Sequence, residues 1–391
     1  MTPGSPELPG VSEVLEDGVA AGVAPAASAA VRLQGELVHL EFRGAAELEP
    51  ARRELEGRDL FDLASLTKAL ATATAAALLV KENRLSLEAP VARYLPGFEA
   101  AGKEAVTVRH LLAHSSGLPA WRPYYERARA DAAAGPAFLE PGRRPPALAA
   151  AFARGRALVR EAVCQEPLEA PAGTRAVYGD PGFLALGFAL ENVLGAPLDA
   201  FFAKRVARPL GLSDTFFVDE ARRGEGVAAG RRFAATERCE HRGEVNCGSV
   251  NDDNAYAVGG VAGHAGLFGT AADVSRLAQV WLDALAGCPG ILDGAVAGEF
   301  ARRDDTPGST RALGWDTPTP GRSTVGSLLG RGPRGAIGHL GYTGCSLWLD
   351  LDRGLACVLL TNHVHPTGRR PAELLRFRQR FHDAVGEALG L

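Results

Sequence analysis

The stretch that decides the fold is Phe61-Asp62-Leu63-Ala64-Ser65-Leu66-Thr67-Lys68. It leads into residues 69–80, which are almost all Ala, Leu and Thr and contain neither Gly nor Pro, so a buried helix is expected over 65–82. Positions three apart share one face of a helix, so the Ser65 hydroxyl and the Lys68 ammonium can meet. They would meet at the helix N-terminus, where backbone N–H groups favour developing negative charge. The stretch therefore predicts a serine nucleophile with a proton acceptor beside it.

The bulk composition narrows the class of protein. With 391 residues, of which 46% are hydrophobic and 23% charged, the chain is long enough for two or three structural units and a large core. The net charge is −4 and no long basic run occurs, so nucleic acid is not expected as a partner. No run approaches about 18 uninterrupted apolar residues, so the sequence predicts no membrane span and no membrane partner.

Two features bear on the cellular compartment. Residues 1–7 contain neither a basic segment nor an apolar one, so no signal peptide is predicted. The six cysteines are scattered, and Cys345 and Cys357 lie in apolar runs that are typical of buried thiols. A cytoplasmic protein with reduced thiols is therefore expected.

Strand-like segments lie at both ends of the chain, and helix-like segments lie between them. Strands are expected over 26–33, 37–42, 312–315, 336–340, 345–350 and 355–361. Helices are expected over 65–82, 107–113, 147–164, 182–194 and 198–207, and again after Thr270 and Pro371. This order predicts an α/β fold with one antiparallel sheet that is built from both chain ends, flanked by helices and interrupted by an inserted all-helical domain. The expected boundaries are 1–64 with 216–391 for the discontinuous sheet domain and 65–215 for the mainly helical domain.

Several motifs run in the order of one known family. Ser65-Leu66-Thr67-Lys68 resembles the Ser-x-x-Lys motif of penicillin-recognising serine hydrolases. The segments 107–119, 171–174, 209–212 and 259–263 look like blocks of the branch that contains class C β-lactamases, D-alanyl-D-alanine peptidases and family VIII esterases. The matches together are far more specific than any one motif.

The resemblance implies a β-lactamase/transpeptidase-like fold with the site in the cleft between the sheet and the helical insert. It also implies acylation of Ser65, with Lys68 and Tyr178 as the proton-transfer pair. The physical chemistry of the side chains agrees independently. A lysine cation beside a phenol favours the phenolate, and burial lowers the pKa of a lysine, so either effect would supply a base near neutral pH.

The second motif departs from the family. The family has Tyr-x-Asn, whereas this chain has Tyr178-Gly179-Asp180. An Asn amide can donate a hydrogen bond to a substrate carbonyl, but an ionised Asp cannot. We expect Asp180 to neutralise Lys68, to cap the helix that opens at Pro181, or to do both.

The third motif departs as well, because His339-Leu340-Gly341 replaces Lys-Thr-Gly or His-Thr-Gly. The missing Lys removes a permanent cation for a substrate carboxylate, and the missing Thr removes a hydroxyl. His339 is expected to face the cleft, with an exposed strand histidine as the alternative. Gly341 permits close approach of the strand. By analogy, the Tyr342 N–H would pair with the Ser65 N–H as an oxyanion hole.

A few other polar and aromatic residues are candidates for the site. His110 and His114 are four apart, but no Glu lies between them and no third ligand is evident, so packing or helix-end hydrogen bonding is expected in place of a metal. Residues 251–254 would either line the cleft or serve only as a turn. The three aromatic residues within 121–125 are expected at a hydrophobic entrance.

The sequence thus predicts a serine hydrolase that uses no metal or cofactor and works through an acyl-enzyme on Ser65. Small carboxylic esters are the leading substrates, because the cell wall is not in the cytoplasm and the carboxylate-binding Lys is absent. One alternative is a β-lactamase or D-Ala-D-Ala-type peptidase that acts on amides. The other is a non-catalytic, penicillin-binding-like ligand sensor on the same scaffold.

Overall fold

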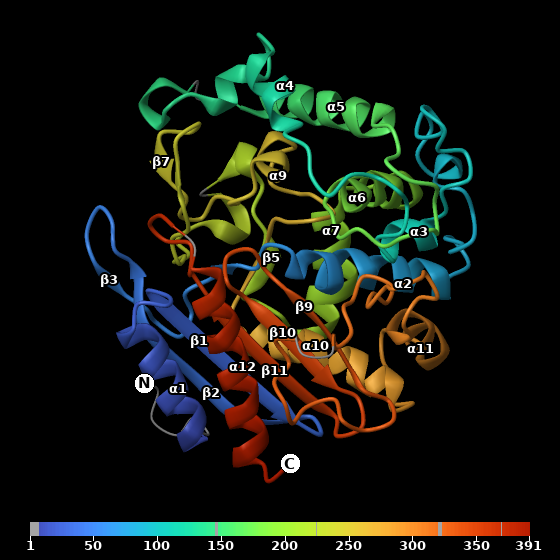
Figure 1. Cartoon of the computed structure of the whole chain (residues 1–391). Helices are drawn as coiled ribbons and strands as arrows, with labels where there is room; N and C mark the ends of the chain where they lie inside the picture. The colour runs from blue at the N-terminus through green and yellow to red at the C-terminus, as the bar shows by residue number, and fades with distance from the viewer. Residues whose placement is uncertain (1–7, 145–147, 224, 320–322, 369) are drawn as a thin grey trace.

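The main sheet is assembled from both ends of the chain. The computed structural model describes residues 8–144, 148–223, 225–319, 323–368 and 370–391. Six antiparallel strands lie in the order β3-β2-β1-β11-β10-β9 (Figure 1). Their bounds are Ala26–Leu33 for β1, Glu36–Glu47 for β2, Arg53–Glu54 for β3, Ala336–Leu340 for β9, Ser346–Asp350 for β10 and Leu355–Thr361 for β11. Because β1 pairs with β11, with Ala30 opposite Val358, the predicted single sheet from both termini is confirmed.

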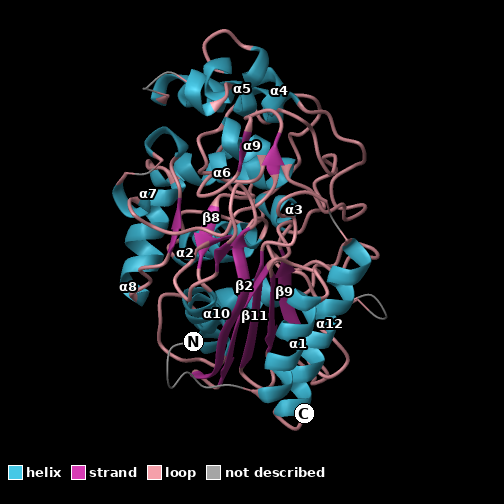
Figure 2. Ribbon diagram, turned by 90° about the vertical axis from the view of Figure 1, so that its left-hand side faces the viewer, coloured by secondary structure: helices cyan, strands magenta, loops and turns pink. Residues whose placement is uncertain are grey.

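Helices cover both faces of this sheet (Figure 2). The helices α1 (Pro9–Ala20) and α12 (Pro371–Ala388) pack side by side on one face, and α10 (Ala271–Leu285) packs on the other. Side chains of β11 alternate between the two faces, as the pleat of a strand requires. Val358 and Leu360 join the core on the α10 side, and Cys357 and Leu359 join the core beneath α1 and α12.

The middle of the chain is helical, as predicted. Its helices are α2 Thr74–Lys81, α3 Val108–Leu112, α4 Tyr125–Ala130, α5 Ala149–Gln165, α6 Pro181–Leu194, α7 Leu198–Phe202 and α8 Arg208–Leu210. The expected helix 147–164 is found as α5, although residue 147 lies outside the described residues. Helix α9 (Asp253–Ala257) comes later in the chain but packs against α4 and α5. The proposed domain boundaries stay a prediction.

Short strands lead the chain to the candidate nucleophile. Strand β4 (Phe61–Asp62) pairs with β8 (Leu267–Gly269), which also pairs with β5 (Thr215–Phe217). A separate two-stranded ribbon joins β6 (Arg238–Cys239) to β7 (Glu244–Val245), and α11 (Gly294–Ala301) follows α10. Because β4 ends three residues before Ser65, this small sheet fixes where the nucleophile segment begins.

The expected strand over 312–315 was wrong. The structure has only isolated bridges there, between Arg311 and Asp316 and between Asp316 and Gly338. Gly314 adopts a φ of +80°, and a Cβ at that position would lie 2.5 Å from the Ala73 Cβ. The apolar run is therefore a tight turn. It is buried because it packs against the helix that follows Ser65, and it does not pair as a strand.

Within the described ranges, no single helix is both long enough and apolar enough to cross a membrane. The helical pair Pro181–Leu194 and Leu198–Leu210 passes by length and composition together but is bent by 67°.

Candidate active site

Ser65 lies in a strained turn that joins β4 to a π-helical segment. The preceding residue, Ala64, has a φ of +46°, which non-glycine residues rarely adopt. The Ala64 N–H donates to the Asp62 carboxylate at 2.8 Å, and this bond holds the turn in place. After the turn, Lys68–Ala73 is a buried π-helix, and α2 continues from it. The sequence predicted the helix but not its wider first turns, which are frequent at functional sites.

The ammonium of Lys68 is the centre of the site. Lys68 is fully buried, and its Nζ lies 2.8 Å from Ser65 Oγ and 3.1 Å from the Tyr178 hydroxyl oxygen. It also lies 2.8 Å from Asp180 Oδ1 and 3.4 Å from the His264 carbonyl oxygen. The predicted convergence of an alcohol, an amine and a phenol from distant parts of the chain is therefore confirmed as geometry.

The charge state of Lys68 differs from the expectation. Burial acts to lower the pKa of Lys68, but Asp180 and Tyr178 outweigh it and raise the pKa above its usual value. The interpretation that burial frees the amine as a neutral base was wrong for that reason. At neutral pH Lys68 is therefore a cation, and it donates hydrogen bonds to the Ser65 and Tyr178 oxygens.

Asp180 pairs with Lys68 and leaves its helix uncapped. It stands at the N-cap position of α6, with Pro181 as the first helical residue, but its side chain makes no capping hydrogen bond. The carboxylate forms an ion pair with Lys68 at 2.8 Å instead. Of the two expected roles of Asp180, the structure shows the neutralisation of Lys68 and no side-chain cap on α6.

His339 lies at the end of β9 and faces the pocket, as predicted. Its side chain is buried, and Nδ1 lies 2.9 Å from the Leu340 carbonyl oxygen. Burial, with Lys68 and Arg311 nearby, holds the pKa of His339 well below its usual value. The ring is therefore neutral, and Nε2 has no hydrogen-bond partner among the described residues.

Gly341 brings the sheet edge against the nucleophile segment. A Cβ on Gly341 would lie 2.8 Å from the Leu63 carbonyl oxygen, so any larger residue would push the strand away. The Gly341 carbonyl accepts a hydrogen bond from Arg378, which is buried on α12. Tyr342 also lines the pocket, and its hydroxyl donates to Glu237 at 3.1 Å. The oxyanion role of the Tyr342 N–H stays a prediction.

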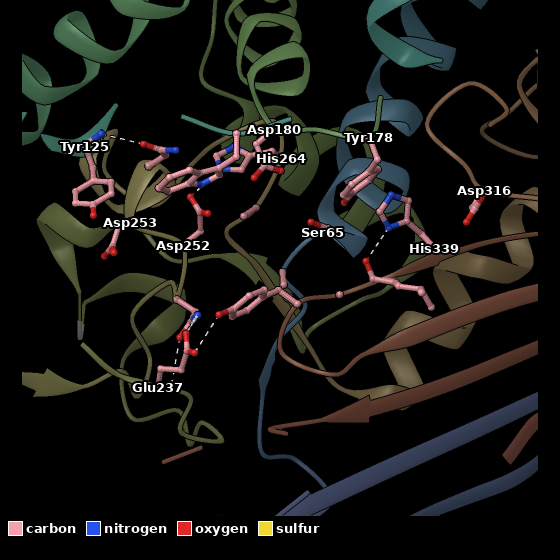
Figure 3. A pocket seen from close by; sticks show the side chains of 18 of the residues that line it. Ser65, Tyr125, Tyr178, Asp180, Glu237, Asp252, Asp253, His264, Asp316 and His339 are labelled. Atoms are coloured by element: carbon pink, nitrogen blue, oxygen red, sulfur yellow. Dashed lines mark hydrogen bonds and ion pairs between the residues drawn. The ribbon is translucent and has the colours of Figure 1, made fainter. Parts of the chain in front are cut away.

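These residues border one pocket of about 570 Å³. Figure 3 shows Ser65 with Tyr178 and His339 on one side and with Asp252 and Glu237 on the other. The lining residues are Ala64, Ser65, Trp121, Tyr125, Tyr178, Asp180, Glu237, Asn251, Asp252, Asp253, Asn254, His264, Ala265, Arg311, Asp316, His339, Leu340, Gly341, Tyr342 and Arg378.

Four charged lining residues were missed from the sequence: Arg311, Asp316, Glu237 and Arg378. Arg311 lies with its guanidinium carbon 4.7 Å from the centre of the Tyr178 ring and 3.4 Å from Asp316 as an ion pair. The N–H groups that this ion pair leaves over can reach a ligand in the pocket. Glu237 comes from a loop that carries no motif. Nothing in the sequence signalled either position, because Arg311 adjoins the run that was interpreted as a strand.

The remaining candidates divide between the site and the scaffold. Residues 251–254 do line the pocket, and Asp252 also caps α9 by accepting the Ala255 N–H at 2.7 Å. Trp121 and Tyr125 line the pocket too. Tyr124 does not, and its hydroxyl donates to Glu166 at 3.0 Å. That part of the predicted entrance was wrong.

Three groups near Lys68 resemble a set of metal ligands. Oxygen atoms of Asp180 and Asp252 and a ring nitrogen of His264 lie within 4.8 Å of one another. Asp180 is already paired with the Lys68 ammonium, and Asp252 contacts His264 Nε2 at 2.7 Å. The positive charge beside these carboxylates is thus supplied by Lys68, and we assign them no metal.

The two histidines of the 107–119 block have different surroundings. His110 belongs to a capping box with Thr107 at the start of α3, which is the helix-end bonding that was expected. His114 packs its ring against Tyr178 and Phe183, with centroid separations of 4.7 Å and 4.9 Å.

A sheet built from both termini, a helical insert, and a Ser-x-x-Lys pair that meets a tyrosine in the cleft together define the architecture of β-lactamases and penicillin-binding proteins. The chain belongs to the beta-lactamase family, whose model matches residues 11–379.

Relatives with curated names carry different activities. The chain is 30% identical to a protein of Bacillus subtilis (strain 168) named N-acetylmuramyl-L-alanine amidase, over 93% of this chain and 82% of that protein. It is also 30% identical to a putative D-alanyl-D-alanine carboxypeptidase of Escherichia coli (strain K12), over 83% of this chain and 74% of that protein.

Solved structures share the fold. EstCE1, described as a hydrolase with promiscuous acyltransferase activity, aligns with a TM-score of 0.70 at 22% identity over 96% of this chain and 97% of its own. The octameric penicillin-binding protein homologue from Pyrococcus abyssi aligns with a TM-score of 0.67 at 20% identity over 97% of this chain and 77% of its own. At these identities the likeness shows the fold alone.

Proposed function

We propose that the chain is a serine hydrolase that forms an acyl-enzyme on Ser65, with small carboxylic esters as its leading substrates. One observation carries the proposal: a single buried ammonium, that of Lys68, lies within hydrogen-bond distance of both Ser65 Oγ and the Tyr178 oxygen. Ser65 and Tyr178 both line the 570 Å³ pocket, so a carbonyl compound in the pocket can reach the hydroxyl.

The geometry supports one assignment of the proton. Because Asp180 keeps Lys68 as a cation, the Tyr178 oxygen, in its phenolate form beside the Lys68 ammonium, is the group left to accept the proton of Ser65. Ser65 Oγ bonds to the ester carbonyl carbon, the bond to the alkoxide breaks, and the proton passes from Tyr178 to the departing alcohol. Water then attacks the acyl-enzyme with Tyr178 as base, which releases the acid and restores Ser65. The Ser65 and Tyr342 amides are the proposed oxyanion donors.

Hydrolysis of p-nitrophenyl butyrate tests this proposal. Ser65→Ala should remove turnover, and Tyr178→Phe should slow it by about 10²- to 10⁴-fold because general-base catalysis is lost. Both variants should keep the wild-type melting temperature within a few degrees, which separates loss of chemistry from loss of fold. Undiminished turnover by Ser65→Ala would contradict the proposal.

Arg311 favours a second candidate function, the hydrolysis of amides that carry a carboxylate. The sequence disfavours such substrates because a cytoplasmic location is expected and the carboxylate-binding Lys of the third motif is missing, but Arg311 brings a guanidinium, paired with Asp316, into the same pocket. Two 30% identical relatives are named as an amidase and a carboxypeptidase. The test compares an N-acyl-D-Ala-D-Ala peptide with its C-terminal amide. A preference for the free carboxylate that Arg311→Gln removes would support this candidate, and equal rates would reject it.

The ligand-sensor alternative and the cellular setting are testable in the same way. A stable mass adduct with nitrocefin, without turnover of ester or peptide, would favour the sensor. The cytoplasmic location, and the expectation of a small-molecule partner without nucleic acid or membrane, stay predictions from the sequence.

A further inference from the structure

His114 is unusual both in its backbone and in its surroundings. It is one of the few non-glycine residues with positive φ, at +56°, and it is buried at the end of the turn after α3. Its ring is held against Phe183 on α6 as well as against Tyr178. A strained backbone at a buried polar residue persists only where the surroundings determine it, and such positions gather at functional sites.

The residues on both sides of Tyr178 are hydrogen-bonded to His114 through their backbone N–H groups. The Val177 N–H donates to the His114 carbonyl oxygen at 2.8 Å, and the Gly179 N–H donates to His114 Nδ1 at 3.3 Å. One residue further on, the Asp180 N–H donates to the Ala120 carbonyl oxygen at 3.0 Å. The turn 114–120 therefore holds the segment 177–180 in place through these backbone hydrogen bonds.

The turn 114–120 and the segment 177–180 pack closely, so the backbone of residue 179 has little room to move. A Cβ on Gly179 would lie 2.6 Å from the Ala120 carbonyl oxygen, so the two backbones are in contact at that point. The tautomer is fixed as well, because a nitrogen that accepts a hydrogen bond carries no proton. Burial, with Arg311 and Lys68 nearby, holds the pKa of His114 well below its usual value, which keeps Nδ1 available as an acceptor.

We propose that His114 is the positioning residue for Tyr178: through its carbonyl, its Nδ1 and its ring it fixes the phenol oxygen beside Lys68 and Ser65. His114 does not line the pocket and touches no reacting atom. Its effect on the reaction is indirect: it sets the position of the Tyr178 oxygen, which lies 3.1 Å from Lys68 Nζ. Misplacement of a reacting group by about 1 Å can cost on the order of a hundredfold in rate. The inference rests on the proposed hydrolase function for its kinetic test but not for its structural one.

Three substitutions separate the contributions of His114. In His114→Asn, the Oδ1 atom takes the place of Nδ1 and the residue type tolerates positive φ, so acceptor and turn are kept while the ring is lost. His114→Phe keeps a ring but loses the acceptor, and His114→Ala loses both. His110→Asn is the matched control, because His110 lies in the same block and its ring accepts the Thr107 N–H at the start of α3, away from Tyr178.

The kinetic test measures ester turnover on protein whose active sites have been counted with a fluorophosphonate. His114→Phe and His114→Ala should lose at least about tenfold in kcat with KM within about threefold, while His114→Asn and His110→Asn stay within about threefold of wild type. A role confined to stability would lower the melting temperature and leave kcat per active site unchanged, which would overturn the proposal. Equal losses in His114→Asn and His114→Phe would also overturn it.

A second readout does not depend on activity. The chain has six tyrosines, so 3-fluorotyrosine labelling gives a small ¹⁹F spectrum in which Tyr178→Phe identifies one resonance. That resonance should shift in His114→Phe and His114→Ala and keep its wild-type position in His110→Asn. An unmoved Tyr178 resonance would refute the positioning role even in an active enzyme. If wild-type protein proves inactive, the hydrolase proposal fails and this spectrum alone decides the role of His114.

Discussion

A fully buried ammonium is stable only when its hydrogen bonds and its counter-charge are supplied, and Lys68 has both. Two hydroxyl oxygens and a carbonyl accept its hydrogen bonds, and Asp180 carries the opposite charge. The replacement of the family's Asn by Asp180 thus changes the chemistry of the residue beside it. It favours the charged ammonium of Lys68 over the neutral amine, so Lys68 is a cation at neutral pH.

Asp180→Asn tests this pairing through stability. Removal of one partner of a buried ion pair leaves the other charge uncompensated, so the free energy of unfolding at pH 7 should fall by roughly 3 kcal/mol. Because the folded-state pKa of Lys68 is raised, its stabilising effect is present at neutral pH and is lost only as the pH rises through that folded-state value. Denaturant titrations at pH 7 and at increasing pH above about 10.5 should therefore show the difference between wild type and variant shrinking.

The control for that experiment is Asp316→Asn, which removes a carboxylate of similar exposure from the same pocket. Asp316 pairs with Arg311 at 3.4 Å where both side chains reach solvent, so its loss should cost less than about 1 kcal/mol. Equal costs for the two substitutions would contradict the special position of Asp180.

Asp62→Asn should change the pH dependence of stability. Burial raises the pKa of Asp62 to about 6, although its carboxylate accepts the Ala64 and Asn251 N–H groups. The folded chain therefore binds this proton more tightly than the unfolded chain, so stability falls as the pH rises from about 4 to 6, by roughly 3 kcal/mol in all. Unfolding free energies measured across that range should fall less steeply in the variant. Parallel curves would show that Asp62 does not titrate there.

At the scale of elements, the sequence predicted correctly those features that depend on neighbouring residues alone. The Ala- and Leu-rich run after Ser65, the alternating strands at both ends and the Thr270 cap of α10 follow from composition and periodicity, which need no knowledge of distant contacts. The site residues Ser65, Lys68 and Tyr178 came from motif order, and their meeting in space is confirmed.

What could not be predicted depends on contacts between distant segments. The raised pKa of Lys68 requires Asp180 at 2.8 Å, which is a fact of packing and not of sequence. The turn at 312–315 has the apolar composition of a strand because it packs on Ala73. Arg311 and Glu237 reach the pocket only because loops far apart in the chain lie beside it.

Gly341→Ala tests the contact between β9 and the nucleophile segment. The added methyl would sit 2.8 Å from the Leu63 carbonyl oxygen, so the strand end must move away from Ser65. We expect a loss of about 1–3 kcal/mol in stability and a slower acylation of Ser65 by a fluorophosphonate. The control is Gly298→Ala in α11, where a Cβ meets nothing within 4 Å, and this change should be neutral or slightly stabilising. Unchanged acylation in Gly341→Ala would argue against the contact.

At the scale of the whole molecule, the site lies where three parts of the chain meet. Ser65 follows a short strand near the N-terminal end, Tyr178 precedes α6 in the helical part, and His339 ends a strand of the main sheet (Figure 3). The core beneath α1 and α12 lies on the far face of the sheet from α10 (Figure 2). Arg378 on α12 reaches the pocket, but no lining residue lies on α1, so stability and site geometry should be separable on α1.

Leu15→Ala tests this separation. Leu15 on α1 is fully buried in the core beneath α1 and α12, so its truncation should lower the free energy of unfolding by about 2–5 kcal/mol. The rate of fluorophosphonate labelling per folded molecule should not change, because no site residue lies on α1. Thermal unfolding and labelling kinetics on the same sample measure both quantities. A rate that falls together with stability would show that the two faces of the sheet are coupled.

The most direct measurement of the central claim is the mass of the trapped covalent intermediate. Wild-type protein quenched in acid during turnover of p-nitrophenyl butyrate should gain the mass of one butyryl group, and peptide mapping should locate that group on Ser65. Tyr178→Phe should gain it more slowly, and Ser65→Ala should not gain it at all. An acyl group mapped to another residue, or ester turnover by Ser65→Ala, would contradict the account.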